Sequence, residues 1–277
     1  MKIEIINSLN FAKLPRVAQQ INDVKKGKSD ELWLATPHSD AHKIISELGL
    51  NPSQVFDIYT QSYFTPIDET KGIWWTDLDV PVGAQIVVNQ NWTKSVTLLG
   101  HEIARVNWYE ASQRIVSDVD WLDNNQQIDY KDVYRRDGSL FSRQYYSENS
   151  FLQIDFYNNS GSDICVRECY FQGKCNFVLA NNQKFQSPES YIAAVGNRRS
   201  DTVFNIAEMG REIHFAPKHT QLSLLDSVLD DNSRIYGNLE TLLKSDQDKI
   251  SNVLVSASSY EILKKAGLPL NKVSIAK

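Results

Sequence analysis

The middle of the chain repeats one short pattern, and this repeat restricts the fold more than any other feature. From about residue 121 to residue 178, an aromatic residue precedes a polar turn roughly every dozen residues, the length of one strand plus one turn. Between turns, apolar residues such as Leu152, Ile154 and Phe156 alternate with polar ones. Because a period of two places alternate side chains on opposite faces of a strand, the repeat predicts an antiparallel β-meander.

The turns support this prediction. Asp137-Gly138 is a strong signal for a tight hairpin, because glycine tolerates positive φ. The aromatic residues that precede the successive turns are Trp121, Tyr134, Tyr146, Tyr157 and Phe171. Such self-similarity at a fixed spacing indicates an internal structural repeat.

The segments on both sides of the repeat alternate strand and helix patterns. Before it we expect strands at 2–7, 31–36 and 84–89 and helices at 14–26 and 39–48. After it we expect helices at 222–229, 238–244 and 259–265 and strands at 252–256 and 272–275. Strands that alternate with helices predict βαβ units and a partly parallel sheet. The predicted organisation is an α/β segment at 1–107, a meander at 108–187 and a returning α/β segment at 188–277, in which the last strand leaves a βαβ pattern to be completed by further chain or a partner.

Bulk properties exclude several classes of protein. The net charge of −5 gives no overall basic field that would attract nucleic acid. The first residues lack the apolar core of a signal peptide, and no apolar run approaches the roughly 20 residues that a spanning helix needs. We therefore expect a soluble, cytoplasmic protein.

Motifs for catalysis or cofactor binding are incomplete. No glycine-rich phosphate loop follows a predicted strand, and there is no nucleophile elbow. His38 and His42 have the spacing of two metal ligands on one helix face, but no third ligand is indicated. His101-Glu102 begins like a zinc-protease motif, which then fails at Arg105. We predict no catalytic residue, no cofactor and no metal.

The cysteines give no sign of a disulfide framework. There are three, Cys165, Cys169 and Cys175, and an odd number in a chain of this size indicates free thiols packed as small hydrophobic side chains.

The meander carries residue types that are typical of binding surfaces. Tyrosine and arginine are enriched at interfaces, and here they interleave. Adjacent aromatics such as Tyr145 and Tyr146 must lie on opposite faces, so some lie outside a single core. The alternative is that the aromatics form the core while the arginines only solubilise the other face. The predicted binding residues are Tyr134, Arg135, Arg136, Arg143, Tyr145, Tyr157 and Arg167.

Three stretches of the meander also resemble a known family. They are YRRDGSLFSRQYY at 134–146, FLQIDFYN at 151–158 and VRECYF at 166–171. They are similar to the extended β-sheet domain of bacterial glycosyltransferases that modify serine-rich repeat adhesins or wall teichoic acid. The first residues, KIEIINSLNFAKLPR, lack the glycine-containing loop of the catalytic GtfA type. The chain therefore resembles the GtfB type, the stabilising glycosylation chaperone of the accessory Sec system.

The resemblance implies incomplete Rossmann-like, GT-B-like halves flanking the extended sheet. It also implies a non-catalytic subunit that binds a GtfA-type catalytic partner and a Ser/Thr-rich acceptor during O-GlcNAc transfer, with possible peripheral attachment to the inner face of the cell membrane. One alternative is the N-terminal part of a UDP-sugar-dependent glycosyltransferase acting on protein or teichoic acid. The other is a plain protein-interaction module.

Overall fold

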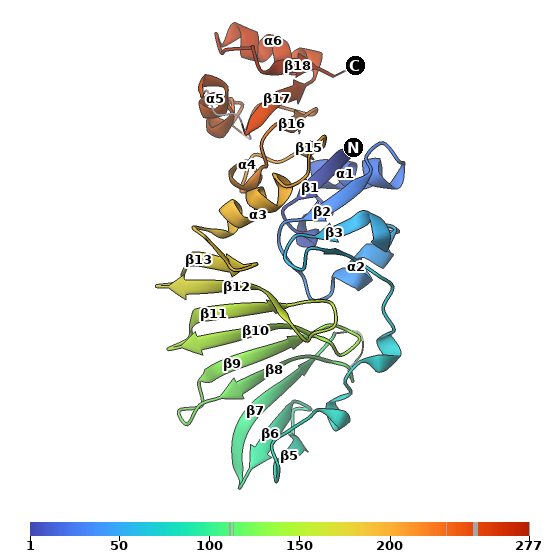
Figure 1. Ribbon diagram of the computed structural model, residues 1–277, viewed down its shortest axis with the longest axis vertical. Helices are drawn as coiled ribbons and strands as arrows, with labels where there is room; N and C mark the ends of the chain where they lie inside the picture. Colours follow the sequence, from blue (N-terminus) through green and yellow to red (C-terminus); the bar gives the residue numbers. More distant parts are fainter. Residues whose placement is uncertain (111, 113, 231, 246–248, 277) are drawn as a thin grey trace. The chain divides into compact units, whose positions relative to one another are not determined.

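The computed structural model describes residues 1–276 except 111, 113, 231 and 246–248. The chain forms two compact units. The first unit contains residues 1–37, 44–58 and 189–277, and the second contains residues 38–43 and 59–188. The first is built on a parallel sheet and the second on an antiparallel sheet, so the predicted mixed α/β fold with a large antiparallel sheet is confirmed (Figure 1).

The parallel sheet combines the two ends of the chain. Its strands are β1 (Lys2–Ile6), β2 (Glu31–Leu34), β3 (Val55–Asp57), β15 (Val203–Ile206), β16 (Thr220–Leu224), β17 (Ile250–Val255) and β18 (Val273–Ile275). Within the described residues, the α-helices are α1 (Pro15–Lys25), α2 (Ala41–Glu47), α3 (Pro188–Gly196), α4 (Glu212–Phe215), α5 (Gly237–Lys244) and α6 (Ala257–Lys265). The strands lie in the order β18-β17-β16-β15-β1-β2-β3, and β1 pairs in parallel with both β2 and β15. The N-terminal and C-terminal segments therefore form one sheet.

Chain direction decides which helices cover which face of this sheet. From β1 the chain moves through α1 and α2 toward β3, and from β15 it moves the opposite way toward β18. Because parallel crossovers are right-handed, α1 and α2 lie on one face and α4, α5 and α6 lie on the other. The face with α4 to α6 is apolar, with fully buried Leu222, Leu224 and Val253.

The antiparallel sheet is a continuous meander. Its strands, in both chain order and spatial order, are β5 (Gln85–Val88), β6 (Lys94–Leu98), β7 (His101–Trp108), β8 (Val116–Leu122), β9 (Ile128–Tyr134), β10 (Leu140–Ser147), β11 (Ser150–Tyr157), β12 (Ile164–Phe171), β13 (Lys174–Ala180) and β14 (Gln183–Phe185). The short strand β4 (Ser62–Tyr63) precedes them. The predicted meander over 121–178 is confirmed, and Gly138 takes the expected positive φ of 82° in the hairpin between β9 and β10.

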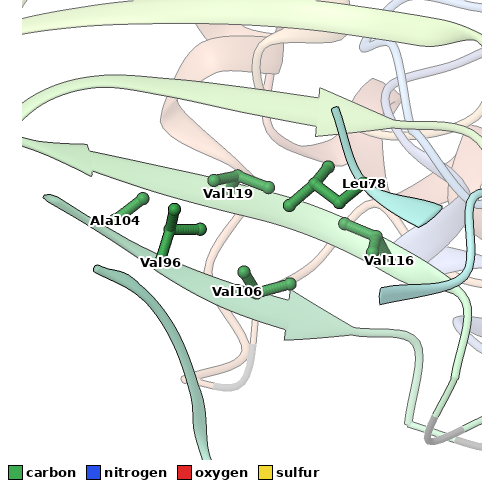
Figure 2. Close-up of a cluster of buried hydrophobic side chains, with 6 residues drawn as sticks. All are labelled: Leu78, Val96, Ala104, Val106, Val116 and Val119. Atoms are coloured by element: carbon green, nitrogen blue, oxygen red, sulfur yellow. The ribbon is translucent and has the colours of Figure 1, made fainter. Parts of the chain in front are cut away.

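A buried apolar cluster covers one end of the sheet. Val96, Val106 and Val119 project from β6, β7 and β8 and form one cluster with Leu78 from the segment that precedes β5 (Figure 2). Ile73 and Trp75 pack against the same cluster. Each buried side chain of this kind stabilises the fold by about 1.5–3 kcal/mol. The cluster covers β6 to β8 and leaves the same face of the later strands without this layer.

Two sequence expectations differ from the structure. The strand predicted at 84–89 exists as β5, but it belongs to the antiparallel sheet, which therefore begins well before the predicted boundary at residue 108. The helix predicted at 222–229 is wrong, because residues 222–224 form the end of β16. Leu222 and Leu224 alternate with Gln221 and Ser223, so the period is two rather than helical.

A substitution at Gly161 tests how closely the connection between β11 and β12 approaches the backbone of Leu140. The φ of Gly161 is +74°, and an added Cβ would lie 2.5 Å from the backbone nitrogen of Leu140. Gly173 has nearly the same φ, +73°, with no atom within 4 Å of an added Cβ. We expect Gly161→Ala to lower the free energy of unfolding by more than 2 kcal/mol and Gly173→Ala by about 1 kcal/mol, the cost of left-handed backbone alone. Urea unfolding of both variants measures the difference, and equal losses would contradict the close approach.

Candidate functional site

One face of the antiparallel sheet is partly exposed from β9 to β12, and we call it the open face. It is defined by Tyr130, Asp132, Arg143, Tyr145, Gln153, Asp155, Tyr157 and Arg167. These residues share a face because they lie at alternate positions of their strands and are paired across them.

A row of alternating charges crosses this face. Asp132 pairs with Arg143, Arg143 with Asp155 and Asp155 with Arg167 on four successive strands. Arg143 binds Asp132 through two hydrogen bonds of 2.6 and 3.0 Å, and Arg167 binds Asp155 through two of 2.6 and 2.9 Å. The two carboxylates are buried, whereas the arginine side chains remain 34% and 37% exposed. The row therefore presents guanidinium edges without accumulating net charge.

An aromatic row runs beside the charges. Trp121, Tyr130 and Tyr145 are directly opposite one another on β8, β9 and β10. Their ring centroids are 5.7 Å apart for the first pair and 6.3 Å apart for the second. Arg143 lies 5.2 Å from the centre of the Tyr130 ring. Stacked rings beside a guanidinium form a rigid surface with both apolar and hydrogen-bonding groups, the combination found in interface hot spots.

Two arginines and two tyrosines of the open face keep one protonation state near neutral pH. The hydrogen bonds that Arg143 donates to Asp132 raise the pKa of Arg143, and those that Arg167 donates to Asp155 raise the pKa of Arg167. Burial raises the pKa of Tyr130 and of Tyr157, so both hydroxyls stay protonated. The open face therefore offers neutral hydroxyl donors and charged arginines.

The structure divides the predicted binding residues into two groups. Arg143, Tyr145, Tyr157 and Arg167 lie together on the open face. Tyr134 is on the same face but is packed against the apolar cluster of β6 to β8.

Arg135 and Arg136 are buried, with exposed fractions of 4% and 5%. Arg135 donates to the carbonyl oxygens of Leu140 (2.9 Å), Asn158 (3.1 Å) and Tyr157 (3.0 Å), which joins the β9–β10 turn to the end of β11. Arg136 forms an ion pair with Asp40. The sequence pattern identified the strand but could not show that the turn folds these two side chains inward.

The opposite face of the sheet contains a buried apolar cluster on β11 to β13. Ile154, Phe156, Val166 and Val178 are buried there, and the Tyr59 ring lies 4.9 Å from that of Phe156. The neighbours Phe156 and Tyr157 thus lie on opposite faces, as the sequence predicted. Some of the aromatic side chains therefore lie in a core, and others lie on the open face.

The free edge at β5 is a second exposed feature, which the sequence did not identify. The strand QIVV contains no charged residue, and Val87 and Val88 are 38% and 42% exposed. Trp92, in the following turn, is 77% exposed. At the other end of the sheet, β14 carries Lys184. Charged residues on edge strands discourage pairing with other chains, so β5 is the less protected edge.

The histidine pair lies outside the open face. His38 Nδ1 accepts a hydrogen bond from the backbone nitrogen of Asp40, and the His42 ring packs 4.9 Å from Phe64. Burial lowers the pKa of both. Among the residues that the structure describes, no group of three or more His, Cys, Asp or Glu side chains is placed to hold a metal ion. Within the same residues, none of the helices combines the length and the apolar character needed to cross a membrane.

The sheet with the open face and the β5 edge coincides with a known domain. Residues 85–187 match the family of GtfB middle domains. The sequence resemblance to GtfB-type proteins is therefore confirmed. The matched residues begin at the first residue of β5 and end two residues beyond β14.

Most of the chain is also similar to a characterised relative. The chain is 22% identical over 254 residues to the UDP-N-acetylglucosamine–peptide N-acetylglucosaminyltransferase stabilizing protein GtfB of Streptococcus agalactiae, covering 87% of this chain and 57% of that protein. The chain thus spans little more than half the length of this relative.

Solved structures share the fold. The pneumococcal O-GlcNAc transferase GtfA in complex with UDP and GlcNAc has a TM-score of 0.73 at 14% identity, covering 100% of this chain and 60% of that one. A chain of a GtfA/B complex bound to UDP and GlcNAc has a TM-score of 0.63 at 15% identity, covering 99% and 61%. The fold is therefore similar to that of GT-B glycosyltransferases.

The buried Arg135 gives a stability prediction for this unit. Replacing it with methionine removes charged donors from three backbone carbonyls, and hydrogen bonds to charged groups contribute about 1.5–3 kcal/mol each. We expect Arg135→Met to lower the free energy of unfolding by about 3 kcal/mol or more. Arg105→Met is the control, since Arg105 is 48% exposed in a surface pair with Glu102, worth at most about 1 kcal/mol. Urea unfolding measures both, and similar losses would show that Arg135 has no structural role.

Proposed function

We propose that this chain is a non-catalytic stabilising subunit of a bacterial protein O-glycosyltransferase complex. The observation that carries the proposal is the match of residues 85–187 to the GtfB middle domain, over the same strands that bear the open face and the β5 edge. In this proposal the subunit works in the cytoplasm, where it can associate peripherally with the inner face of the cell membrane. Its partner is a catalytic subunit of the GtfA type.

The chemistry of the open face supports an acceptor polypeptide rather than a teichoic acid. Asp132 and Asp155 neutralise Arg143 and Arg167, so the face has no excess positive charge to attract a chain of phosphates. Exposed guanidinium edges and tyrosine hydroxyls can instead donate hydrogen bonds to peptide carbonyls and to Ser or Thr hydroxyls. We propose that this face holds the Ser/Thr-rich acceptor, a serine-rich repeat adhesin, during addition of GlcNAc.

The β5 edge supports a separate contact with the catalytic subunit. An edge strand presents unpaired backbone groups, and an extended strand of another protein can add to it. Val87, Val88 and Trp92 would add exposed apolar area to this contact. Stabilisation then follows by mass action, because binding to the folded partner favours its folded state.

A substitution in β5 tests the partner contact. In cells that express both proteins, we expect the unaltered chain to raise the yield of soluble catalytic subunit and to co-purify with it. Val87→Lys, which places a charge on the edge, should reduce co-purification at least tenfold. Phe185→Lys, at the opposite edge in β14, is the control and should retain the partner. Equal retention by both variants would reject the β5 contact. A partner that is equally soluble and active alone would reject the stabilising role.

Two adjacent tyrosines test the open face. Tyr145 lies on it, and Tyr146 points to the opposite face, where its ring lies 4.7 Å from that of Phe151. We expect Tyr145→Ala to weaken binding of an unmodified Ser/Thr-rich peptide at least tenfold, a loss of about 1.4 kcal/mol. Tyr146→Ala should leave binding within about twofold. Fluorescence anisotropy of a labelled peptide measures both.

Either of two results would contradict this assignment. If Tyr146→Ala causes the larger loss, the acceptor binds the other face. If the purified chain alone transfers sugar from a UDP-sugar to the peptide, the chain is part of a catalytic glycosyltransferase instead.

A further inference from the structure

From β15 to β18, the parallel sheet of the first unit has one apolar and one polar face, which is unusual for parallel strands. Parallel strands are normally buried on both faces and have nearly continuous apolar sequences. Here β16 and β17 alternate, with Leu222 and Val253 fully buried beneath α4 to α6. On the opposite face, Gln221, Ser223 and Asn252 are only half-buried.

The polar side chains of this face form a continuous chain of hydrogen bonds. Ser274 donates to Asn252 (2.8 Å), and Asn252 donates to Gln221 (3.1 Å). Gln221 donates to Asn205 (3.2 Å), and Asn205 donates to Glu4 (2.6 Å). We call the residues Ser274, Asn252, Gln221, Asn205 and Glu4 the polar ladder. It crosses strands β18 to β1. In each of these bonds the donor is the residue farther from the Glu4 carboxylate.

The end of the ladder is rigid. Glu4 is fully buried and also accepts hydrogen bonds from Ser29 (2.7 Å) and Gln20 (3.0 Å). Lys2 lies 3.0 Å from the same carboxylate. Because each amide is oriented by the next, the ladder is organised before any ligand arrives, which reduces the entropy cost of binding.

A cavity of about 670 Å³ lies beside the ladder. Asn205, Gln221 and Ser223 line it together with α1 and the ends of β16 and β18. Its volume is within the range of small-molecule sites, about 300–1,000 Å³. Leu225 and Ile275, each 46% exposed, add apolar wall beside these polar groups.

The charges that line the cavity are paired within the protein. Arg16 binds Asp226 (2.8 Å), Lys28 lies 3.8 Å from Asp23, and Lys2 pairs with Glu4. The lining therefore has no concentrated charge to select a phosphate or a carboxylate. It offers amides and hydroxyls, which both donate and accept hydrogen bonds, next to apolar side chains.

We propose that this cavity binds a neutral saccharide. Sugar hydroxyls exchange hydrogen bonds with carboxamides and serine hydroxyls, and the C–H face of a sugar ring packs on apolar walls such as Leu225 and Ile275. A packed helix would instead need a broad apolar surface for its own apolar stripe. The proposal does not depend on the proposed stabilising function, because the cavity belongs to the other unit and involves no partner.

A cavity-blocking substitution tests the proposal. Gln19 is an exposed residue of α1 that lines the cavity, and Asn22 is an exposed residue of the same helix that does not. The probes are glucose, N-acetylglucosamine and their disaccharides, with glucose 6-phosphate as the anionic counterpart. Saturation-transfer NMR detects weak binding of each directly.

We expect at least one neutral sugar to bind the unaltered chain and the Asn22→Trp variant alike, and to bind Gln19→Trp at least tenfold more weakly. Glucose 6-phosphate should bind no better than glucose. A second variant, Asn252→Leu, interrupts the ladder without adding charge and should weaken binding of the same sugar.

Three outcomes would overturn the proposal. They are absence of binding by every neutral probe, unchanged binding in Gln19→Trp, and preference for the phosphorylated sugar. A further contrary result would be that an added polypeptide, but no sugar, protects β16 to β18 from hydrogen exchange. The polar face would then be a contact for another protein. None of these outcomes depends on the catalytic partner or on the open face.

Discussion

The cross-strand register of the antiparallel sheet is the constraint on which its surfaces depend. A slip of one residue between β10 and β11 would place Tyr145 and Arg143 on the same face as Phe156, which is buried on the opposite face of the sheet. The ion pairs help to specify this register, because Asp132 and Asp155 are buried and need a cation on the neighbouring strand. A buried carboxylate without a partner costs several kcal/mol, so misaligned pairings are strongly disfavoured. The interaction that fixes the strands is the same one that orients the arginines toward solvent.

Both units use rows of polar side chains that run across strands, with different consequences. On the antiparallel sheet the row consists of opposite charges, which hold two guanidinium groups at fixed positions on an exposed surface. On the parallel sheet the row consists of neutral amides and hydroxyls, which end at a buried carboxylate. The first suits a polypeptide that lies along a surface. The second, beside a cavity, suits a small neutral molecule.

Local sequence pattern predicts an element where its separate signals agree. The meander was predictable because alternation, turn residues and strand length are all local and agree with one another. The helix α1 was predictable for the same reason, with Pro15 at its start and Val17, Ile21 and Val24 buried at helical spacing. The helix predicted at 222–229 failed because Leu222 and Leu224 continue the alternation of β16, whose first residues lie outside the predicted range. The strand at β5 was found, but its membership in the antiparallel sheet depends on its partner β6, which the prediction did not include.

The sequence by itself determined the meander, the positions of its hairpins and the residue types that an interface would use. It also carried the resemblance to GtfB-type proteins, because that signal lies in the strands themselves. Only the tertiary structure decided that Arg135 and Arg136 are buried while Arg143 and Arg167 are exposed, since this depends on carbonyl and carboxylate groups far along the chain. The pairing of β1 with β15 and the polar ladder across β18 to β1 were equally inaccessible. They join residues about 200 positions apart, and no local pattern encodes which distant strands become neighbours.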